Sequence, residues 1–189
     1  MVDLKPMLLA KQRDFLLREK LFSLKDKVDI MDPLTQEPVG SVERKIFSIR
    51  TLYRLYNRGF LNEMIVQQKL LSFPAAYKFY TGNDNGEPED AACLGILKKK
   101  FLSLAPSYWF ETPDGKRVFE MRGDFVGLTY GVVQDGKEIA DISRTFWAIR
   151  DTYGIRINPE VPDQMALLVL CSVIVIHAIH EARKNRGWS

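Results

Sequence analysis

Two histidines and a carboxylate stand together near the C-terminus. His177 and His180 are three residues apart, and Glu181 follows directly. On a helix such positions are neighbours, so these side chains could approach a metal ion. The spacing matches neither zinc-protease motif, and the chain has no third histidine. We therefore treat His177, His180 and Glu181 as weak metal candidates and expect no metal and no cofactor. Alternatively, the imidazoles lie near the end of a helix, whose partial negative charge favours imidazolium.

A run of three lysines, Lys98-Lys99-Lys100, is the best candidate for a lipid- or anion-binding surface. Three further lysines could join it if they align around one rim: Lys20, Lys45 and Lys69. Near an anionic bilayer each lysine contributes about 1 kcal/mol, so about four to six together could hold a domain there reversibly. In the alternative interpretation these lysines form an ordinary solvated face.

No pattern of catalytic residues accompanies these groups. The chain contains no nucleophile elbow, phosphate-binding loop or dinucleotide fingerprint. The acidic segment 83–90 lacks calcium-loop spacing, because Gly86 comes too early and Pro88 interrupts it. We therefore predict no catalytic residue and expect the chain not to be an enzyme.

Composition favours one ordinary globular domain. The chain has 189 residues, of which 46% are hydrophobic and 27% charged, with a net charge of +3. This mild excess, without a recognised motif, leads us to expect no nucleic-acid partner. The two cysteines, Cys93 and Cys171, indicate no disulfide framework, and residues 1–10 show no signal-peptide pattern. We expect a cytoplasmic location, with possible peripheral attachment to a membrane.

The chain repeats a short motif of a basic residue followed by apolar residues and serine. We expect each copy to be a strand that leads into a second strand. The copies are Lys20–Leu24, Lys45–Ile49, Lys69–Phe73, Lys100–Leu104 and, more weakly, Arg144–Ile149. The second strands are expected at Lys27–Met31, Leu52–Tyr56, Tyr77–Thr81, Tyr108–Thr112 and Tyr153–Ile157. The pairs Asn85-Gly86, Asp114-Gly115 and Asp135-Gly136 are typical of tight hairpin turns, so the pattern predicts an antiparallel meander.

One apolar segment differs from the rest. Met165–Ile176 is almost wholly apolar and follows Pro162 and Asp163, which are typical of a helix start. Because it has no polar stripe, a helix here must be buried on every side. Its apolar stretch of about 15 residues is shorter than the roughly 20 that span a membrane. Burial inside a closed sheet is therefore favoured over insertion as a tail anchor, and no transmembrane span is expected.

These features resemble the LURP-one-related family. The resemblance rests on the opening Asp14–Leu24, on the repeated lysine segments and on Asp163 at the start of the final helix. It covers residues 12–182 and leaves an N-terminal extension, 1–11, and a basic tail, 183–189. The family belongs to the Tubby C-terminal-like group, together with phospholipid scramblases. The resemblance implies a mainly β fold, an antiparallel barrel of about twelve strands closed around a hydrophobic helix near 163–182. An aspartate is common in the second half of that helix, where His177 and His180 stand here.

The resemblance supplies no catalytic residues. It favours a non-catalytic binding module that recognises anionic lipid or an acidic protein surface through the basic rim. Two alternatives remain open at this stage. One is a small-ligand carrier or enzyme with a cavity at the barrel mouth, lined by His177, His180 and Glu181. The other is a scramblase-like membrane protein whose final helix leaves the barrel.

Overall fold

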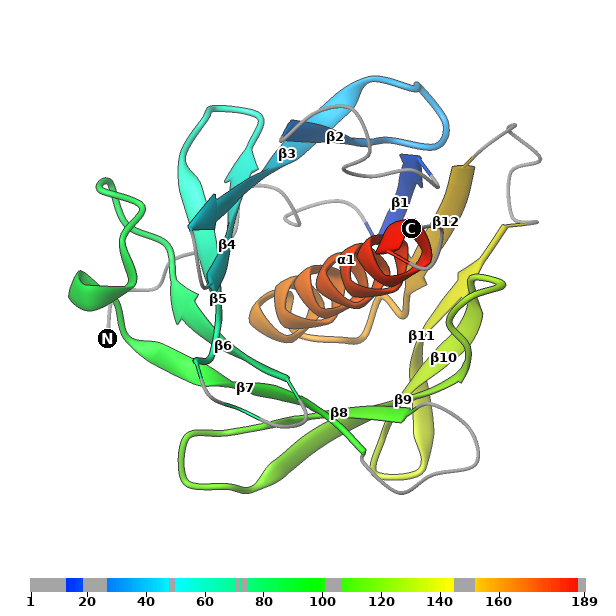
Figure 1. The fold of residues 1–189 in the computed structure, drawn as a ribbon. Coiled ribbons are helices and arrows are strands. Elements are labelled where there is room, and N and C mark those ends of the chain that lie inside the picture. Colours follow the sequence, from blue (N-terminus) through cyan, green and yellow to red (C-terminus); the bar gives the residue numbers. More distant parts are fainter. Residues whose placement is uncertain are drawn as a thin grey trace.

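The architecture is a closed antiparallel β-barrel around one helix (Figure 1). The computed structural model describes residues 13–18, 27–47, 50–70, 72, 75–100, 107–144 and 152–186. Within them, each strand pairs with its neighbours in sequence, and the first strand closes against the last. The predicted mainly β fold class and the closed barrel are confirmed. The strands are β1 (Asp14–Arg18), β2 (Lys27–Met31), β3 (Pro38–Phe47), β4 (Arg50–Asn57), β5 (Asn62–Gln68), β6 (Ala76–Thr81), β7 (Cys93–Lys99), β8 (Ser107–Glu111), β9 (Arg117–Asp124), β10 (Thr129–Gln134), β11 (Lys137–Ser143) and β12 (Thr152–Ile157).

Successive side chains along each strand point alternately to the inner and the outer face of the barrel wall. In β8, Tyr108 and Phe110 are buried, whereas Trp109 between them lies on the outer face and is partly exposed. Phe110 faces Phe119 of β9 in register, and their rings stack at 5.2 Å between centroids. Inward-facing side chains, which are aromatic in β8 and aliphatic in some other strands, therefore fill the space between wall and helix.

Two of the predicted Asp-Gly turns have the positive φ angles that such hairpins use. Gly115 lies at φ 88°, and Asp135 and Gly136 lie at 48° and 78°. These conformations are inexpensive for glycine and tolerated by aspartate. The turns connect β8 to β9 and β10 to β11 and fix the register of both hairpins.

The helix α1 (Asp163–Arg186) occupies the centre of the barrel (Figure 1). Its residues Leu170, Val173 and Ile176 are fully buried, each with 0% exposure. Residues 163–182 are long and apolar enough to cross a membrane by length and composition, and 72% of the most apolar window is buried inside the barrel. The all-round apolar character thus has its structural explanation in a wall that surrounds the helix.

The start of α1 is attached to β1. An Arg13 guanidinium nitrogen lies 2.5 Å from Asp163 Oδ1 and donates to the carbonyl oxygen of Val161 at 3.2 Å. The Asp163 carboxylate also lies in the first helical turn, where the positive end of the helix dipole favours negative charge. These contacts join the first strand to the last element of the chain.

The repeated lysines that the structure describes lie near or just after the ends of strands. The predicted second strands are confirmed as β2, β4, β6, β8 and β12. The strand predicted from Lys69 is wrong, because β5 ends at Gln68 and the Lys69 N–H donates to the Ala76 carbonyl across the connection. Lys100 likewise follows the end of β7. An apolar residue in a connection can resemble the apolar pattern of a strand. Leu70 is such a residue, since it lies after β5 and is 37% exposed. The copy Lys20–Leu24 and residues 101–104 and 145–149 lie outside the described residues.

Candidate anion-binding end of the barrel

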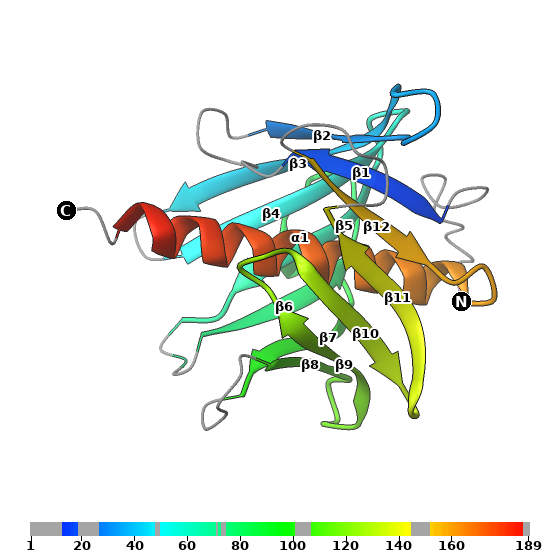
Figure 2. The ribbon, with the colours of Figure 1, turned by 90° about the vertical axis from the view of Figure 1, so that its right-hand side faces the viewer.

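The antiparallel order sends alternate connections to opposite ends of the barrel. We call one end the basic end: it holds the connections after β3, β5, β7, β9 and β11, and α1 finishes there. The other is the acidic end, with the connections after β2, β4, β6, β8, β10 and β12 and the start of α1. In Figure 2 the helix runs across the view, so the basic end lies at the left and the acidic end at the right.

The topology brings the candidate lysines together at the basic end. Lys45 lies near the end of β3, and Lys69 and Lys100 directly follow β5 and β7. All three side chains are exposed. Lys69 and Lys98 are separated by one strand, because Ala76 of β6 lies opposite both. Lys20 lies outside the described residues.

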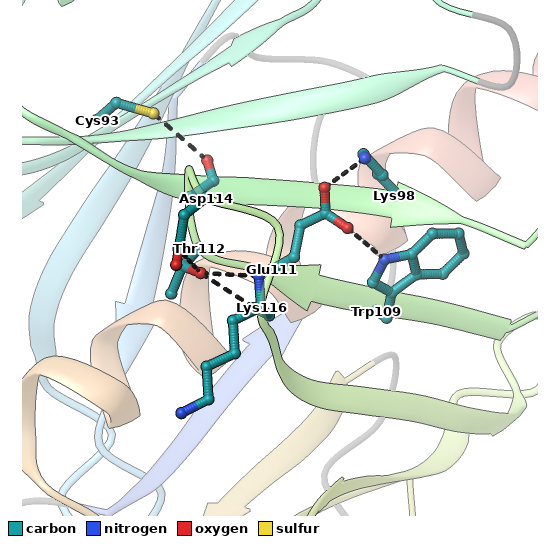
Figure 3. A network of polar contacts seen from close by, with 8 residues as sticks. Cys93, Lys98, Trp109, Glu111, Thr112, Asp114 and Lys116 are labelled. Atoms are coloured by element: carbon teal, nitrogen blue, oxygen red, sulfur yellow. Dashed lines mark hydrogen bonds and ion pairs between the residues drawn. The ribbon is translucent and has the colours of Figure 1, made fainter.

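The other two lysines of the run differ from Lys100. Lys98 points to the outer wall and forms an ion pair with Glu111, whose second oxygen accepts from Trp109 Nε1 at 2.9 Å (Figure 3). Burial acts to raise the pKa of Glu111, but the hydrogen bonds from Lys98 and Trp109 outweigh it and the pKa lies below its usual range. Lys99 faces Tyr108 in register and so lies on the inner side. The charge of Lys98 is therefore largely neutralised by Glu111 of the adjacent strand β8.

Ion pairs also neutralise the charged side chains on the wall beside Lys98. The Arg117 guanidinium lies over the Trp109 ring, 5.2 Å from its centroid, and pairs with Glu120 at 2.5 Å. Arg122 forms a second ion pair with Glu120. Burial would raise the pKa of Glu120, yet the two arginines hold it below its usual range. The outer face of β7–β9 thus balances its charges, and the exposed lysines Lys45, Lys69 and Lys100 lie at the barrel end.

Carboxylates gather at the opposite end. Apart from Arg58 and Lys116, the charged side chains described in the acidic-end connections are acidic. They include Asp32, Glu37, Asp84, Glu87, Glu89, Asp114, Asp135 and Glu160. In the described parts of the basic-end connections the charged residues are Lys69, Lys100 and Arg144. The barrel is therefore polarised along the helix axis.

The two histidines lie inside the mouth of the basic end and contact aromatic rings. His180 Nε2 is 2.9 Å from the Tyr108 hydroxyl, and its ring stacks on Phe125 with centroids 5.8 Å apart. His177 meets the edge of Tyr153 at 4.7 Å. Among the described residues, no three His, Cys, Asp or Glu side chains are placed to hold a metal ion. The metal interpretation of His177, His180 and Glu181 gains no support from this geometry.

Tyrosines complete the interior of the mouth. Tyr53 is 6% exposed, and its burial is the main reason that its pKa is raised. The neighbouring Tyr77 and Glu181 raise the pKa of Tyr53 further, whereas Arg44 acts to lower it. Arg44, Tyr53 and Tyr77 come from β3, β4 and β6, and the effect of Glu181 on Tyr53 places them near the last turns of α1. Sequence analysis missed Tyr53, Tyr77 and Phe125, although the alternation in β4 and β6 places both tyrosines on the inner face.

A small apolar cavity lies between α1 and the wall, and neither histidine lines it. Its volume is about 10 Å³, close to the space that one water molecule needs. Ligand pockets have volumes of roughly 300–1,000 Å³, so this cavity does not support the carrier alternative. It is lined by Val42, Tyr53, Leu55, Val66, Cys171, Ile174 and Val175.

Comparisons with known proteins agree with the geometry. A family model described as LURP-one-related matches residues 13–176. The X-ray structure of a protein from Arabidopsis thaliana is similar, with a TM-score of 0.58 and 11% sequence identity, covering 88% of this chain and 91% of that one. At that identity the likeness concerns the fold alone. No curated protein matches the chain in sequence. The family and its barrel suggest a binding module.

Proposed function

We propose that this chain, which belongs to the LURP-one-related family, is a non-catalytic binding module that docks its basic end on an anionic membrane surface. The single observation that carries the proposal is the separation of charge along the barrel axis. Exposed Lys45, Lys69 and Lys100 converge on one end, while the carboxylates of the turns gather at the other. A membrane with anionic lipid would attract the first end and repel the second.

The strength of this attraction suits reversible docking. Each lysine near an anionic surface contributes about 1 kcal/mol, so the three exposed lysines together contribute about 3 kcal/mol. Charges interact over a Debye length of about 8 Å at physiological ionic strength, so binding of this kind weakens as salt is added.

The type of cation favours lipid over an acidic protein. Lysine carries a compact, hydrated charge on a flexible stem, whereas arginine offers a planar fork for fixed carboxylates. Lys45, Lys69 and Lys100 follow three different strands and so are spread around the mouth. A fluid layer of headgroups can meet such dispersed charges without matching a fixed pattern.

Co-sedimentation with vesicles tests the proposal. Full-length protein is mixed with phosphatidylcholine vesicles, pure or containing phosphatidylserine or a phosphoinositide, at low and physiological salt. The variant Lys45→Glu/Lys69→Glu/Lys100→Glu is compared with Arg58→Glu/Lys116→Glu/Lys137→Glu, which makes the same change in net charge at the acidic end. We expect salt-sensitive binding to anionic vesicles that only the first variant loses.

Two outcomes would contradict the proposal. If the wild-type chain binds no anionic vesicle at low salt, membrane docking is wrong, and binding to polyglutamate would then indicate an acidic protein partner. If both triple variants lose binding equally, net charge alone is responsible and the basic end has no special role.

A further inference from the structure

Among the described residues, three large apolar side chains project from the basic end. Ile46 is 67% exposed, Leu70 37% and Val126 68%. Ile46 follows Lys45 near the end of β3, and Leu70 follows Lys69 just after β5. Each apolar side chain comes from a different hairpin. They are single tips distributed around the same mouth as the lysines.

The turn that carries Val126 is firmly held. Asp124 Oδ1 accepts the backbone N–H groups of Val126 at 3.0 Å and Gly127 at 2.8 Å. Phe125 and Leu128 on either side are 2% exposed, and Leu128 adopts a positive φ of 55°, which is unusual for leucine. Such backbone strain persists only where the surrounding structure enforces it. The turn buries its apolar neighbours in the mouth and leaves Val126 outside.

Apolar and cationic side chains occur together around the described part of this mouth. Following the strand order from β3 to β10, exposed Lys45 and Ile46 come first, then Lys69 and Leu70, then Lys100, and then Val126 beside the exposed Asp124. A folded protein partner would need a separate pocket for each tip. A bilayer interface accepts apolar groups below the phosphates and cations at their level, wherever they stand.

We propose that Ile46, Leu70 and Val126 enter the interfacial layer of an anionic bilayer while Lys45, Lys69 and Lys100 contact its headgroups. This inference rests on the proposed membrane docking and adds an orientation and an apolar contribution to it. The barrel then stands on its basic end, with α1 running toward the membrane and its C-terminus facing the surface (Figure 2).

The apolar tips make part of the binding resistant to salt. Moving each of these side chains from water into the bilayer should strengthen binding by about three- to tenfold. A tenfold change in affinity corresponds to about 1.4 kcal/mol. Ionic screening weakens the lysine contribution and leaves the apolar one. We therefore expect a weak but measurable fraction of bound protein at salt concentrations where lysines alone would release it.

The first experiment removes the tips without changing any charge. Ile46→Ser/Leu70→Ser/Val126→Ser is compared in vesicle co-sedimentation with Leu34→Ser/Phe60→Ser/Leu61→Ser, whose targets are 85%, 75% and 55% exposed at the acidic end. With phosphatidylserine-containing vesicles, the first variant should bind about 30-fold more weakly or worse. The second should bind like the wild type. Circular dichroism confirms that both variants fold.

The second experiment reports the depth of single positions. Val126→Cys and Leu34→Cys are each prepared with Cys93→Ser, so that one exposed thiol carries an environment-sensitive dye while Cys171 stays buried. With anionic vesicles the dye at position 126 should shift to the blue and brighten. The dye at position 34 should keep the spectrum that it has in water.

The outcomes separate this inference from the membrane docking on which it rests. If the chain binds anionic vesicles, but the dye at position 126 stays in water and the serine variant binds normally, docking is purely electrostatic and the inference is overturned. If only the dye at position 34 shifts, the opposite end faces the membrane. If the wild-type chain binds no vesicle, both proposals fail.

Discussion

At the acidic end, buried polar side chains hold the turns, whereas aromatic rings close the basic end. Asn57, 3% exposed, accepts the N–H groups of Gly59 and Leu61 through Oδ1 and donates to Glu63 through Nδ2. Arg54, 4% exposed, donates to the Gly86 carbonyl at 2.6 Å and fastens the β6–β7 loop over the wall. At the basic end, the rings of Tyr108, Phe125, Tyr130 and His180 pack on one another.

The surface charges follow the same axis and agree with the helix dipole. A helix carries partial positive charge at its start and partial negative charge at its end. Asp163 and the acidic turns surround the start of α1, and the lysines surround its end. Polarisation of the barrel is therefore favourable for the fold, and it also leaves two chemically different surfaces for partners.

Exposed apolar residues occur at both ends, so charge is what distinguishes the two surfaces. At the acidic end, Phe60 adopts a positive φ of 61° and is 75% exposed. The neighbouring turns are joined by the Arg58–Glu37 ion pair at 3.0 Å. Locally, the Lys27 ammonium lies 5.4 Å from the centroid of the Phe60 ring, and the Asp124 carboxylate accepts from the Val126 N–H. The difference in charge therefore holds for the connections of each end as a set and not for each single tip.

The largest effect is expected from the aromatic closure of the basic end. Phe125→Ala removes a ring whose centroid lies 4.5 Å from Tyr130 and 5.0 Å from Tyr108, and should lower the free energy of unfolding by about 3–5 kcal/mol. Urea unfolding measures it. Phe60→Ala at the acidic end should stay within about 0.5 kcal/mol. Similar losses for both variants would refute the contrast between a packed mouth and an exposed tip.

A smaller loss is expected from the polar scaffold of the acidic end. Asn57→Ala removes the acceptor of two part-buried hydrogen bonds, each worth about 0.5–1.5 kcal/mol, and should cost about 1–3 kcal/mol of unfolding free energy. Asn85→Ala, at an exposed position in another turn of the same end, serves as the control and should change little. Equal stability of the two variants in urea unfolding would show that Asn57 does not hold its turn.

Two tyrosines in the mouth of the basic end, Tyr108 and Tyr153, should respond differently to the loss of their hydroxyl groups. Tyr108→Phe removes the hydrogen bond to His180 and should cost about 0.5–1.5 kcal/mol. The buried Tyr153 hydroxyl has no hydrogen-bond partner among the described residues. Tyr153→Phe should therefore be neutral or stabilising, since it removes an unsatisfied polar group. Thermal unfolding of both variants measures the difference, and a larger loss for Tyr153→Phe would contradict the assigned contacts.

The smallest effect is a dependence on pH in the wall between the ends. The pKa of Glu111 is lowered in the folded state, so its ion pair stabilises the fold above the unfolded pKa of about 4.3. That contribution is lost as the pH falls through the lower, folded pKa. Glu111→Gln should be less stable than the wild type at pH 7, and the gap should close in strong acid. A gap that is constant with pH would exclude this ionic origin.

Local chemistry determined much of the architecture. Alternating residues specified β2, β4, β6, β8 and β12, and Asp-Gly pairs specified two hairpin turns, because strand faces and positive φ angles depend on neighbouring residues. The all-round apolar segment at 165–176 specified a buried helix for the same reason. Leu70 misled the strand prediction, since an apolar residue in a connection has no local mark that separates it from one in a strand.

The sequence by itself therefore determined the elements, the lysines and their repetition. Only the tertiary structure decided what stands beside each lysine and which end it reaches. Lys45, Lys69 and Lys100 are 24 and 31 residues apart, and strand pairing alone brings them to one end. Lys98 is neutralised by Glu111 of the next strand, and His180 meets Tyr108 from 72 residues away. These contacts depend on barrel closure around α1, whose non-local geometry no short stretch of sequence contains.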